Sequence, residues 1–192
     1  MRQRVPRNRR VIARRRRSDQ DAALESLHAA NAADLLSYFG RRVAVPADAA
    51  DLLSETFIVA WRRIEQLPAD PERARMWLFG VARRVHSNAA RGAIRHDDLT
   101  QKLRQHFDNH PTDPVNADTL DIRAALNSLP ENQSELIRLI LWDGFTLPEA
   151  ATILGVSEST ARGRHQRAKL RLQTLLRLGE PHRGSTNKDL RS

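Results

Sequence analysis

Residues 146–172 read TLPEAATILGVSESTARGRHQRAKLRL and combine two helical patterns with a short turn. Thr146 and Glu149 have the spacing of a capping box, which predicts that a short helix begins here. Gly155 opens the turn, and Ser157 is a typical N-cap for a second, longer helix. Two helices joined by a tight turn that contains glycine are the layout of a helix-turn-helix. This stretch therefore predicts a small all-α domain.

The longer helix, which we expect to end near Leu178, has two different faces. Its inward face consists of Ala161, His165, Ala168 and Leu172. The outward face carries hydroxyl, amide and guanidinium groups: Ser159, Arg162, Gly163 and Gln166, flanked by Arg164, Arg167 and Lys169. Guanidinium groups match guanine edges and amides match adenine, so this face is typical of a helix that reads the major groove. An ordinary αα-hairpin with a solvated charged face is the alternative.

Helical periodicity also precedes the helix-turn-helix. The apolar positions that carry it are Leu120, Ala124, Leu126, Leu136, Ile137, Ile140 and Leu141. Ser128 and Glu131 lie on either side of Pro130 with capping-box spacing, which predicts that a helix starts there. Asp143 and Gly144 are expected to end that helix.

The first half of the chain predicts three further helices and no strand. The first runs from Ser18 to Gly40, the second opens at Pro46, and the third starts near Glu72 and fades near Gly92. The expected apolar stripe of the second helix is Leu53, Phe57, Ala60, Ile64 and Leu67. The expected core side of the third helix is Leu78, Val81, Ala82, Val85 and Ala89. Trp61 and Trp77 have helical spacing and are interpreted as core residues, although either could stack on a base.

These patterns predict an all-α chain of two small helical domains joined by a flexible acidic linker. The expected divisions are a disordered Arg-rich arm at 1–17, a helical domain at 18–95, the linker at 96–117, the helix-turn-helix domain at 118–178 and a disordered tail at 179–192.

The net charge of +9 has one source. Residues 1–17 contain nine of the 32 basic residues and none of the 23 acidic ones, so the rest of the chain is neutral. Within that rest, residues 72–95 and 158–178 are basic, and acidic stretches separate them. This pattern indicates two surfaces that face a polyanion, unless both are only solvated helix faces. The arm is either a DNA tether or an overhang from an early start codon.

Composition excludes several classes of protein. The chain has no cysteine, which excludes a disulfide scaffold, a thiolate metal site and a cysteine nucleophile.

Because no apolar run approaches the ~20 residues that span a bilayer, we expect a soluble, cytoplasmic protein. The sequence has no phosphate-cradling glycine loop and no Gly-x-Ser-x-Gly motif, so we expect no enzyme activity and no cofactor. His106 and His110 have metal-ligand spacing, but they lie in a polar linker without an HExxH motif, so we expect no metal site.

Three stretches resemble the conserved regions of one family. Residues 48–64 read DAADLLSETFIVAWRRI, residues 75–91 read RMWLFGVARRVHSNAAR, and residues 125–176 read ALNSLPENQSELIRLILWDGFTLPEAATILGVSESTARGRHQRAKLRLQTLL. They are similar to the second and fourth conserved regions of ECF (extracytoplasmic function) sigma factors of the sigma-70 family. The resemblance implies a promoter-specificity subunit that binds core RNA polymerase and directs transcription initiation. The alternative is a stand-alone helix-turn-helix regulator that binds duplex operator DNA.

The resemblance also implies roles for individual residues. Those expected to grip the clamp helices of the polymerase's largest subunit are Asp48, Asp51, Ser54, Glu55, Ile58 and Arg62. Those expected at the minus-ten element are Arg73, Arg75, Arg83, Arg84, Asn88 and Arg91. Those expected at the minus-thirty-five element are Ser159, Thr160, Arg162, Gly163, Arg164, Gln166 and Arg167. Arg84 stands where the family commonly has Asn, and His165 where Leu is usual.

The resemblance further implies three partners and no small-molecule substrate. These are core polymerase, whose flap would contact the fourth region, promoter DNA, and an anti-sigma factor. The acidic linker is either a mimic of nucleic acid in a basic polymerase channel or a solvated spacer.

Overall fold

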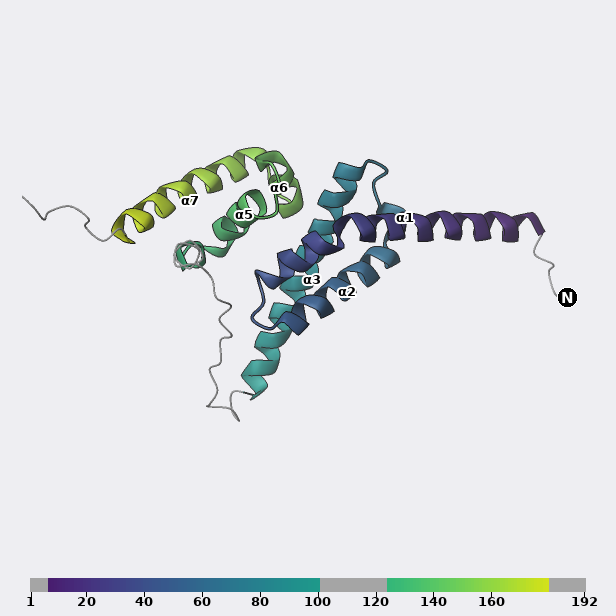
Figure 1. Cartoon of the computed structure of the whole chain (residues 1–192), viewed down its shortest axis with the longest axis horizontal. Helices are drawn as coiled ribbons and strands as arrows, with labels where there is room; N and C mark the ends of the chain where they lie inside the picture. The colour runs from purple at the N-terminus through teal and green to yellow at the C-terminus, as the bar shows by residue number, and fades with distance from the viewer. Residues whose placement is uncertain (1–6, 101–123, 180–192) are drawn as a thin grey trace, which may run out of the picture. The chain divides into compact units, whose positions relative to one another are not determined.

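The computed structural model describes residues 7–100 and 124–179, and every regular element in these ranges is a helix (Figure 1). The chain divides into two compact units between Pro111 and Thr112. The predicted all-α fold with two helical units is therefore confirmed. The expected linker after residue 100, the tail after 179, and His106 and His110 lie outside the described residues.

The first unit contains α1 (Arg7–Gly40), α2 (Pro46–Arg62), a short 3-10 helix, η1 (Ile64–Gln66), and α3 (Pro71–Thr100). The three α-helices pack against one another (Figure 1). Aromatic rings fill the centre of this core. The Tyr38 ring meets Phe39 and Phe79 edge-on, with centroids 5.2 and 5.4 Å apart. Such T-shaped pairs contribute about 0.5–1.5 kcal/mol beyond their buried area.

Two of the predicted helix ends in this unit are wrong. Helix α1 begins at Arg7 and runs through Ser18, so residues 7–17 are helical rather than a disordered arm. Helix α3 continues through Gly92 to Thr100, so residues 96–100 belong to it rather than to the linker. Neither extension contains a proline. Arginine and alanine are good helix formers, and one glycine costs only about 1 kcal/mol in a helix.

The buried side of α2 also differs from the prediction. Its buried residues are Ala49, Leu52, Thr56 and Ala60. The predicted stripe residues Leu53 and Phe57 are only half-buried, although the Phe57 ring lies 4.6 Å from that of His28 on α1. Helix α2 packs against both α1 and α3. The residues that face the space between these two helices are therefore the most buried, even though the residues beside them are bulkier.

Two other residues that were expected in the core of this unit face solvent. Trp61 is 39% exposed, so its interpretation as a core residue is wrong, whereas Trp77 is half-buried. Ala89 is exposed because it lies on α3 beyond Val85, the last buried residue among residues 71–92 of that helix, whose burial the structure describes.

The second unit contains one helical turn at 124–127, then α5 (Glu131–Leu141), α6 (Leu147–Leu154) and α7 (Glu158–Gly179). A core cluster joins the helical turn, α5 and α7, and it consists of Leu126, Leu129, Ile137 and Ala168, with Trp142 and Leu172 packed against it.

Two expectations about α5 are wrong. No side chain caps its start, and the Ser128 hydroxyl instead donates a 2.7 Å hydrogen bond to the Ala125 carbonyl in the preceding turn. Pro130 occupies the N-cap position itself, so Ser128 lies two residues too early to serve as the cap. Leu141, expected on the apolar face, is 62% exposed because α5 ends there.

Candidate nucleic-acid interface

The start of α6 is held by the predicted capping box. The Thr146 backbone N–H donates a 2.7 Å hydrogen bond to Glu149 Oε2, and the Thr146 hydroxyl lies 2.8 Å from the same oxygen. A capping box satisfies backbone donors that the first turn of a helix otherwise leaves free. It therefore fixes where α6 begins.

The turn between α6 and α7 is a Schellman motif. Gly155 is left-handed, with φ +67° and ψ +37°. The Val156 N–H donates to the Ala151 carbonyl at 3.0 Å, and the Gly155 N–H donates to the Thr152 carbonyl at 3.1 Å. This double closure ends α6 and redirects the chain into α7.

Small residues bring α6 and α7 close together. Ala150 and Ala151 on α6 are buried, and Ala161 and Ala168 on α7 are fully buried. His165 and Leu172, the other two residues of the predicted inward face, are half-buried. The predicted helix-turn-helix and the orientation of α7 within it are thus confirmed.

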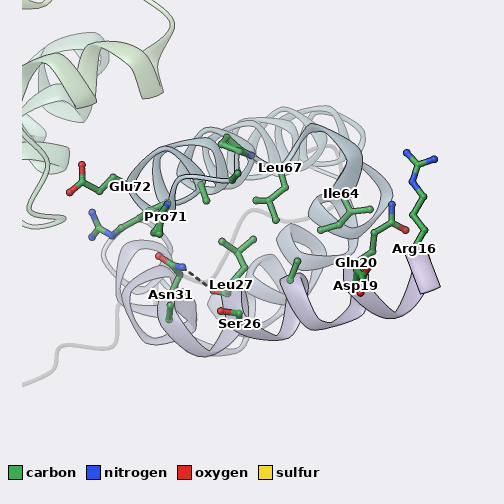
Figure 2. Close-up of a pocket in the computed structure, with 16 residues that line it drawn as sticks. Arg16, Asp19, Gln20, Ser26, Leu27, Asn31, Ile64, Leu67, Pro71 and Glu72 are labelled. Atoms are coloured by element: carbon green, nitrogen blue, oxygen red, sulfur yellow. Dashed lines mark hydrogen bonds between the residues drawn. The ribbon is translucent and has the colours of Figure 1, made fainter. Parts of the chain in front are cut away.

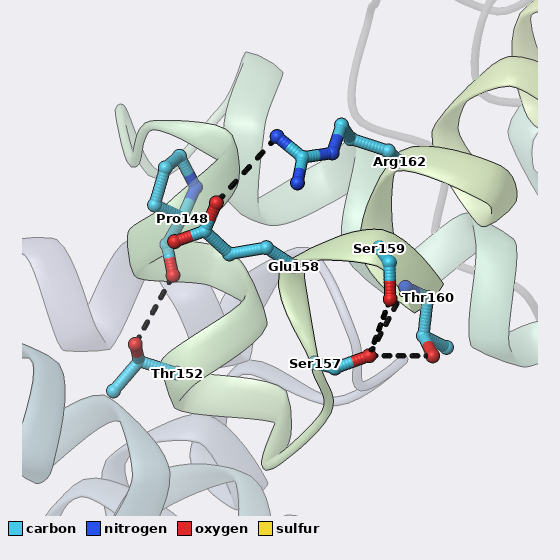
Figure 3. A network of polar contacts seen from close by, with 7 residues as sticks. All are labelled: Pro148, Thr152, Ser157, Glu158, Ser159, Thr160 and Arg162. Atoms are coloured by element: carbon cyan, nitrogen blue, oxygen red, sulfur yellow. Dashed lines mark hydrogen bonds and ion pairs between the residues drawn. The ribbon is translucent and has the colours of Figure 1, made fainter.

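Hydroxyl groups gather at the start of α7 (Figure 3). Ser157 Oγ accepts a 3.2 Å hydrogen bond from the Thr160 backbone N–H, which confirms it as the N-cap. The same oxygen lies 3.0 Å from Ser159 Oγ and 2.9 Å from Thr160 Oγ1. All three residues are exposed, so this first turn presents polar groups on the same face as the arginines that follow.

The outward face of α7 is accessible at every predicted position. Ser159, Thr160, Arg162, Gln166 and Arg167 are exposed, and Gly163 and Arg164 are half-buried. Arg162 Nη1 lies 3.6 Å from Glu158 Oε2, an ion pair with both side chains more than half exposed (Figure 3).

Arg167 lies along the helix over Gly163. A Cβ added to Gly163 would lie 3.5 Å from Arg167 Nη1, at ordinary van der Waals distance. The missing side chain at Gly163 therefore leaves a flat surface beside the guanidinium group.

The six residues predicted to contact the minus-ten element fall into two groups. Arg73, Arg84, Asn88 and Arg91 are exposed, whereas Arg75 and Arg83 are half-buried. Arg75 Nη2 lies 3.2 Å from Asp34 Oδ2 on α1, and the Arg75 guanidinium carbon lies 5.0 Å from the centroid of the Phe79 ring. Arg75 therefore joins α3 to α1, a role that the sequence does not indicate because its partner lies 41 residues away.

A groove of about 670 Å³ lies beside the segment that connects α2 to α3 (Figure 2). The connecting segment contributes Ile64, Leu67 and Pro68 to its wall, and α1 contributes Leu27 and Asn31. The Asn31 amide donates a 2.9 Å hydrogen bond to the Leu27 carbonyl. The sequence does not indicate the α1 side of this groove, because only the fold brings α1 to the connecting segment.

The outer face of α2 is fully available to a partner. All six residues predicted to contact polymerase are exposed: Asp48, Asp51, Ser54, Glu55, Ile58 and Arg62. Ile58 is 50% exposed, and Trp61, one helical turn further on, is 39% exposed. Exposed apolar groups among charges are typical of a protein interface. Trp61 was missed as part of this face because a tryptophan at helical spacing is usually buried.

Within residues 7–100 and 124–179, no group of three or more His, Asp or Glu side chains is arranged to hold a metal ion. No helix in the described part of the chain is long and apolar enough to cross a membrane.

Both units match known families. Residues 27–101 match the family described as Sigma-70 region 2, and residues 119–172 match the family described as Sigma-70, region 4. The match to region 2 covers α2, α3 and residues 27–40 of α1, and the match to region 4 covers the helix-turn-helix.

Relatives and a solved structure match most of the chain. The ECF RNA polymerase sigma factor SigL of Mycobacterium tuberculosis is 31% identical over 162 residues, which cover 82% of this chain and 92% of SigL. The ECF RNA polymerase sigma factor EcfG of Rhodopseudomonas palustris is 30% identical over 135 residues, which cover 67% of this chain and 71% of EcfG. The sigma factor RpoE from Bartonella quintana, solved in complex with the anti-sigma factor NepR, matches with a TM-score of 0.56 and 27% identity over 85% of this chain and 98% of RpoE.

Proposed function

The chain belongs to the ECF RNA polymerase sigma factors of the sigma-70 family, and we propose how its two units divide the work of transcription initiation. It is a sigma factor, which directs initiation by binding core RNA polymerase and promoter DNA, and sigma factors are not themselves catalysts. The observation that carries the proposal is the presence of a region 2 unit and a helix-turn-helix unit in one chain. A stand-alone regulator would not need the region 2 unit.

Helix α7 is proposed to read the minus-thirty-five element in the major groove. Its exposed Arg162, Gln166 and Arg167 carry the groups that recognise base edges, while Ser159 and Thr160 lie where the helix start meets phosphates. The proposed domain for this role spans residues 118–178.

Helix α3 and the segment before it are proposed to open and read the minus-ten element. Opening a duplex without a nucleotide cofactor requires binding energy, which comes from holding the separated strand and its unstacked bases. Exposed Arg73, Arg84, Asn88 and Arg91 supply cations and an amide for this purpose. Of the half-buried pair, Arg83 remains a candidate contact, and Arg75 would have to leave Asp34 to reach DNA.

The exposed face of α2 is proposed to bind the clamp helices of the largest polymerase subunit, with Ile58 as an apolar anchor among charges. The helix-turn-helix unit would contact the polymerase flap. By analogy with RpoE, which was solved with NepR, we propose that an anti-sigma factor holds this protein inactive. Since bacterial core polymerase and the chromosome share the cytoplasm, we propose that the protein acts there.

Run-off transcription with core polymerase tests the whole proposal. We expect promoter-specific transcripts only when the chain and core are combined, and we expect separate losses when the minus-ten or the minus-thirty-five box is scrambled. Arg167→Ala should lower promoter affinity by about 5- to 150-fold, the equivalent of about 1–3 kcal/mol, and should relax preference at one base of the minus-thirty-five box.

The matched control is Lys169→Ala, an exposed cation on the same helix outside the proposed base contacts, which should leave base preference unchanged. Tight binding of duplex DNA by the free protein, together with an absence of core-dependent transcripts, would instead identify a stand-alone regulator.

A further inference from the structure

The N-terminal extension of α1 is the most strongly charged part of the chain. Residues 7–17 contain seven arginines and no acidic or aromatic residue. They continue the same helix that packs in the first unit, and in Figure 1 this part of α1, drawn in dark purple, projects beyond α2 and α3. At about 1.5 Å per residue, residues 7–15 alone extend the helix by about 14 Å. The arginines are therefore carried on a helical arm whose direction the rest of α1 sets.

The base of this arm is attached to the segment between α2 and α3. Arg16 Nη2 lies 3.2 Å from Glu65 Oε1 in η1. Arg16 also lines the groove beside that segment, together with Asp19, Gln20, Ile64 and Leu67 (Figure 2). Both side chains of the ion pair are about two-thirds exposed, so the pair contributes little to folding stability. It does show that the base of the arm lies next to η1.

We propose that this arginine helix binds the phosphate backbone of promoter DNA next to the minus-ten element. The inference rests on the proposed function of the α2–α3 segment, and it adds a binding surface that lies outside the region 2 match at 27–101. Duplex DNA carries one charge per ~1.7 Å of its axis, so a 14 Å arm spans several phosphates. Protein interfaces are typically built on apolar and aromatic anchors. Residues 7–17 contain no aromatic residue, and Val11, Ile12 and Ala13 are their only apolar ones. This composition favours a nucleic-acid partner over a protein partner.

The test is a salt titration of promoter binding by holoenzyme made from core polymerase and the full chain. The variant replaces Arg7, Arg9, Arg10, Arg14 and Arg15 with Gln, which has a helix propensity similar to that of Arg. Each phosphate contact contributes about 0.9 to the slope of log affinity against log salt, so three contacts would reduce the slope by about 2.7. The affinity loss between 50 and 200 mM salt would then be roughly 40-fold smaller in the variant than in the unmodified protein.

The matched control replaces the same five arginines with Lys. Because lysine also neutralises phosphates as a point charge, this variant should keep the slope of the unmodified protein. A slope unchanged in the Gln variant, with normal promoter-specific transcripts, would overturn the inference and leave the proposed function intact. A Gln variant that keeps the slope but binds core polymerase more weakly would also overturn it, and would assign the arginines to a protein partner. Failure of the unmodified protein to give transcripts with core would instead contradict the proposed function.

Discussion

Replacing Gly155 should destabilise the helix-turn-helix by an amount that depends on the backbone alone. Its φ of +67° lies in the left-handed region, and a Cβ added there would meet no heavy atom within 4 Å. The expected penalty is therefore conformational rather than steric. Gly155→Ala should lower the free energy of unfolding by about 1–2 kcal/mol. Gly155→Asn should cost less, since Asn tolerates this conformation, and β-branched Gly155→Val should cost more.

Gly163→Ala is the matched control and should have the opposite effect. Gly163 lies inside α7 with a negative φ, and its added Cβ would meet Arg167 only at ordinary contact distance. Alanine in a helix interior is favoured over glycine by about 0.8–1 kcal/mol. The two Gly→Ala variants, eight residues apart in one unit, should therefore differ in stability by about 2–3 kcal/mol.

Urea unfolding followed by Trp142 fluorescence measures this difference, because Trp142 packs against the core of the second unit. Trp61 and Trp77, both in the first unit, are replaced with Phe in every protein compared so that Trp142 is the sole reporter. A shift of the midpoint at constant slope reports stability. The reasoning is refuted if Gly155→Ala leaves the midpoint unchanged, or if Gly163→Ala lowers it by a similar amount.

Three further predictions concern a cap, an ion pair and a partner surface. Glu149→Ala should lower the stability of the second unit by about 1 kcal/mol in the same urea assay, because it removes the acceptor of the Thr146 N–H; no loss would show that the capping box is not needed. A double-mutant cycle on Asp34 and Arg75 should give a coupling energy of at most about 1 kcal/mol by urea unfolding, since the pair is part exposed. If Arg75→Ala reduces transcription far more than Asp34→Ala does, Arg75 contacts DNA rather than only joining α3 to α1. Ile58→Glu should weaken core polymerase binding in a pull-down, whereas Leu36→Glu, at another residue that is about half exposed, should not. Equal losses in the two variants would contradict α2 as the specific contact.

The parts of the structure that could be predicted from the sequence are those decided by neighbouring residues. Thr146 with Glu149 and Gly155 with Ser157 act over three residues or fewer, so the ends of α6 and the start of α7 follow directly from local chemistry. The orientation of α7 was also predictable, because its small residues recur at helical spacing.

The parts that could not be predicted depend on distant residues or on the absence of a helix breaker. Helix α1 extends to Arg7 and α3 to Thr100 because nothing in the sequence stops them, and a search for stop signals cannot detect this. The burial of α2 depends on two partner helices, so Thr56 is enclosed and Trp61 is exposed against their average preferences. The contact of Arg75 with Asp34 likewise exists only in the folded unit.

Under the proposed function, two of the described ion pairs would moderate the DNA affinity of the two cationic surfaces. Arg16 pairs with Glu65 beside the α2–α3 segment, and Arg162 pairs with Glu158 on α7. Each ion pair is exposed and contributes at most about 1 kcal/mol. The carboxylate of the pair therefore competes with a DNA phosphate for the arginine, but it is too weak a partner to prevent the arginine from contacting that phosphate. Each pair would thereby weaken binding by either surface alone. If polymerase holds both surfaces against one promoter, as proposed, their contributions would combine in one complex and would readily exceed these small penalties. Promoter selectivity would then depend on joint engagement of the two units rather than on the strength of either.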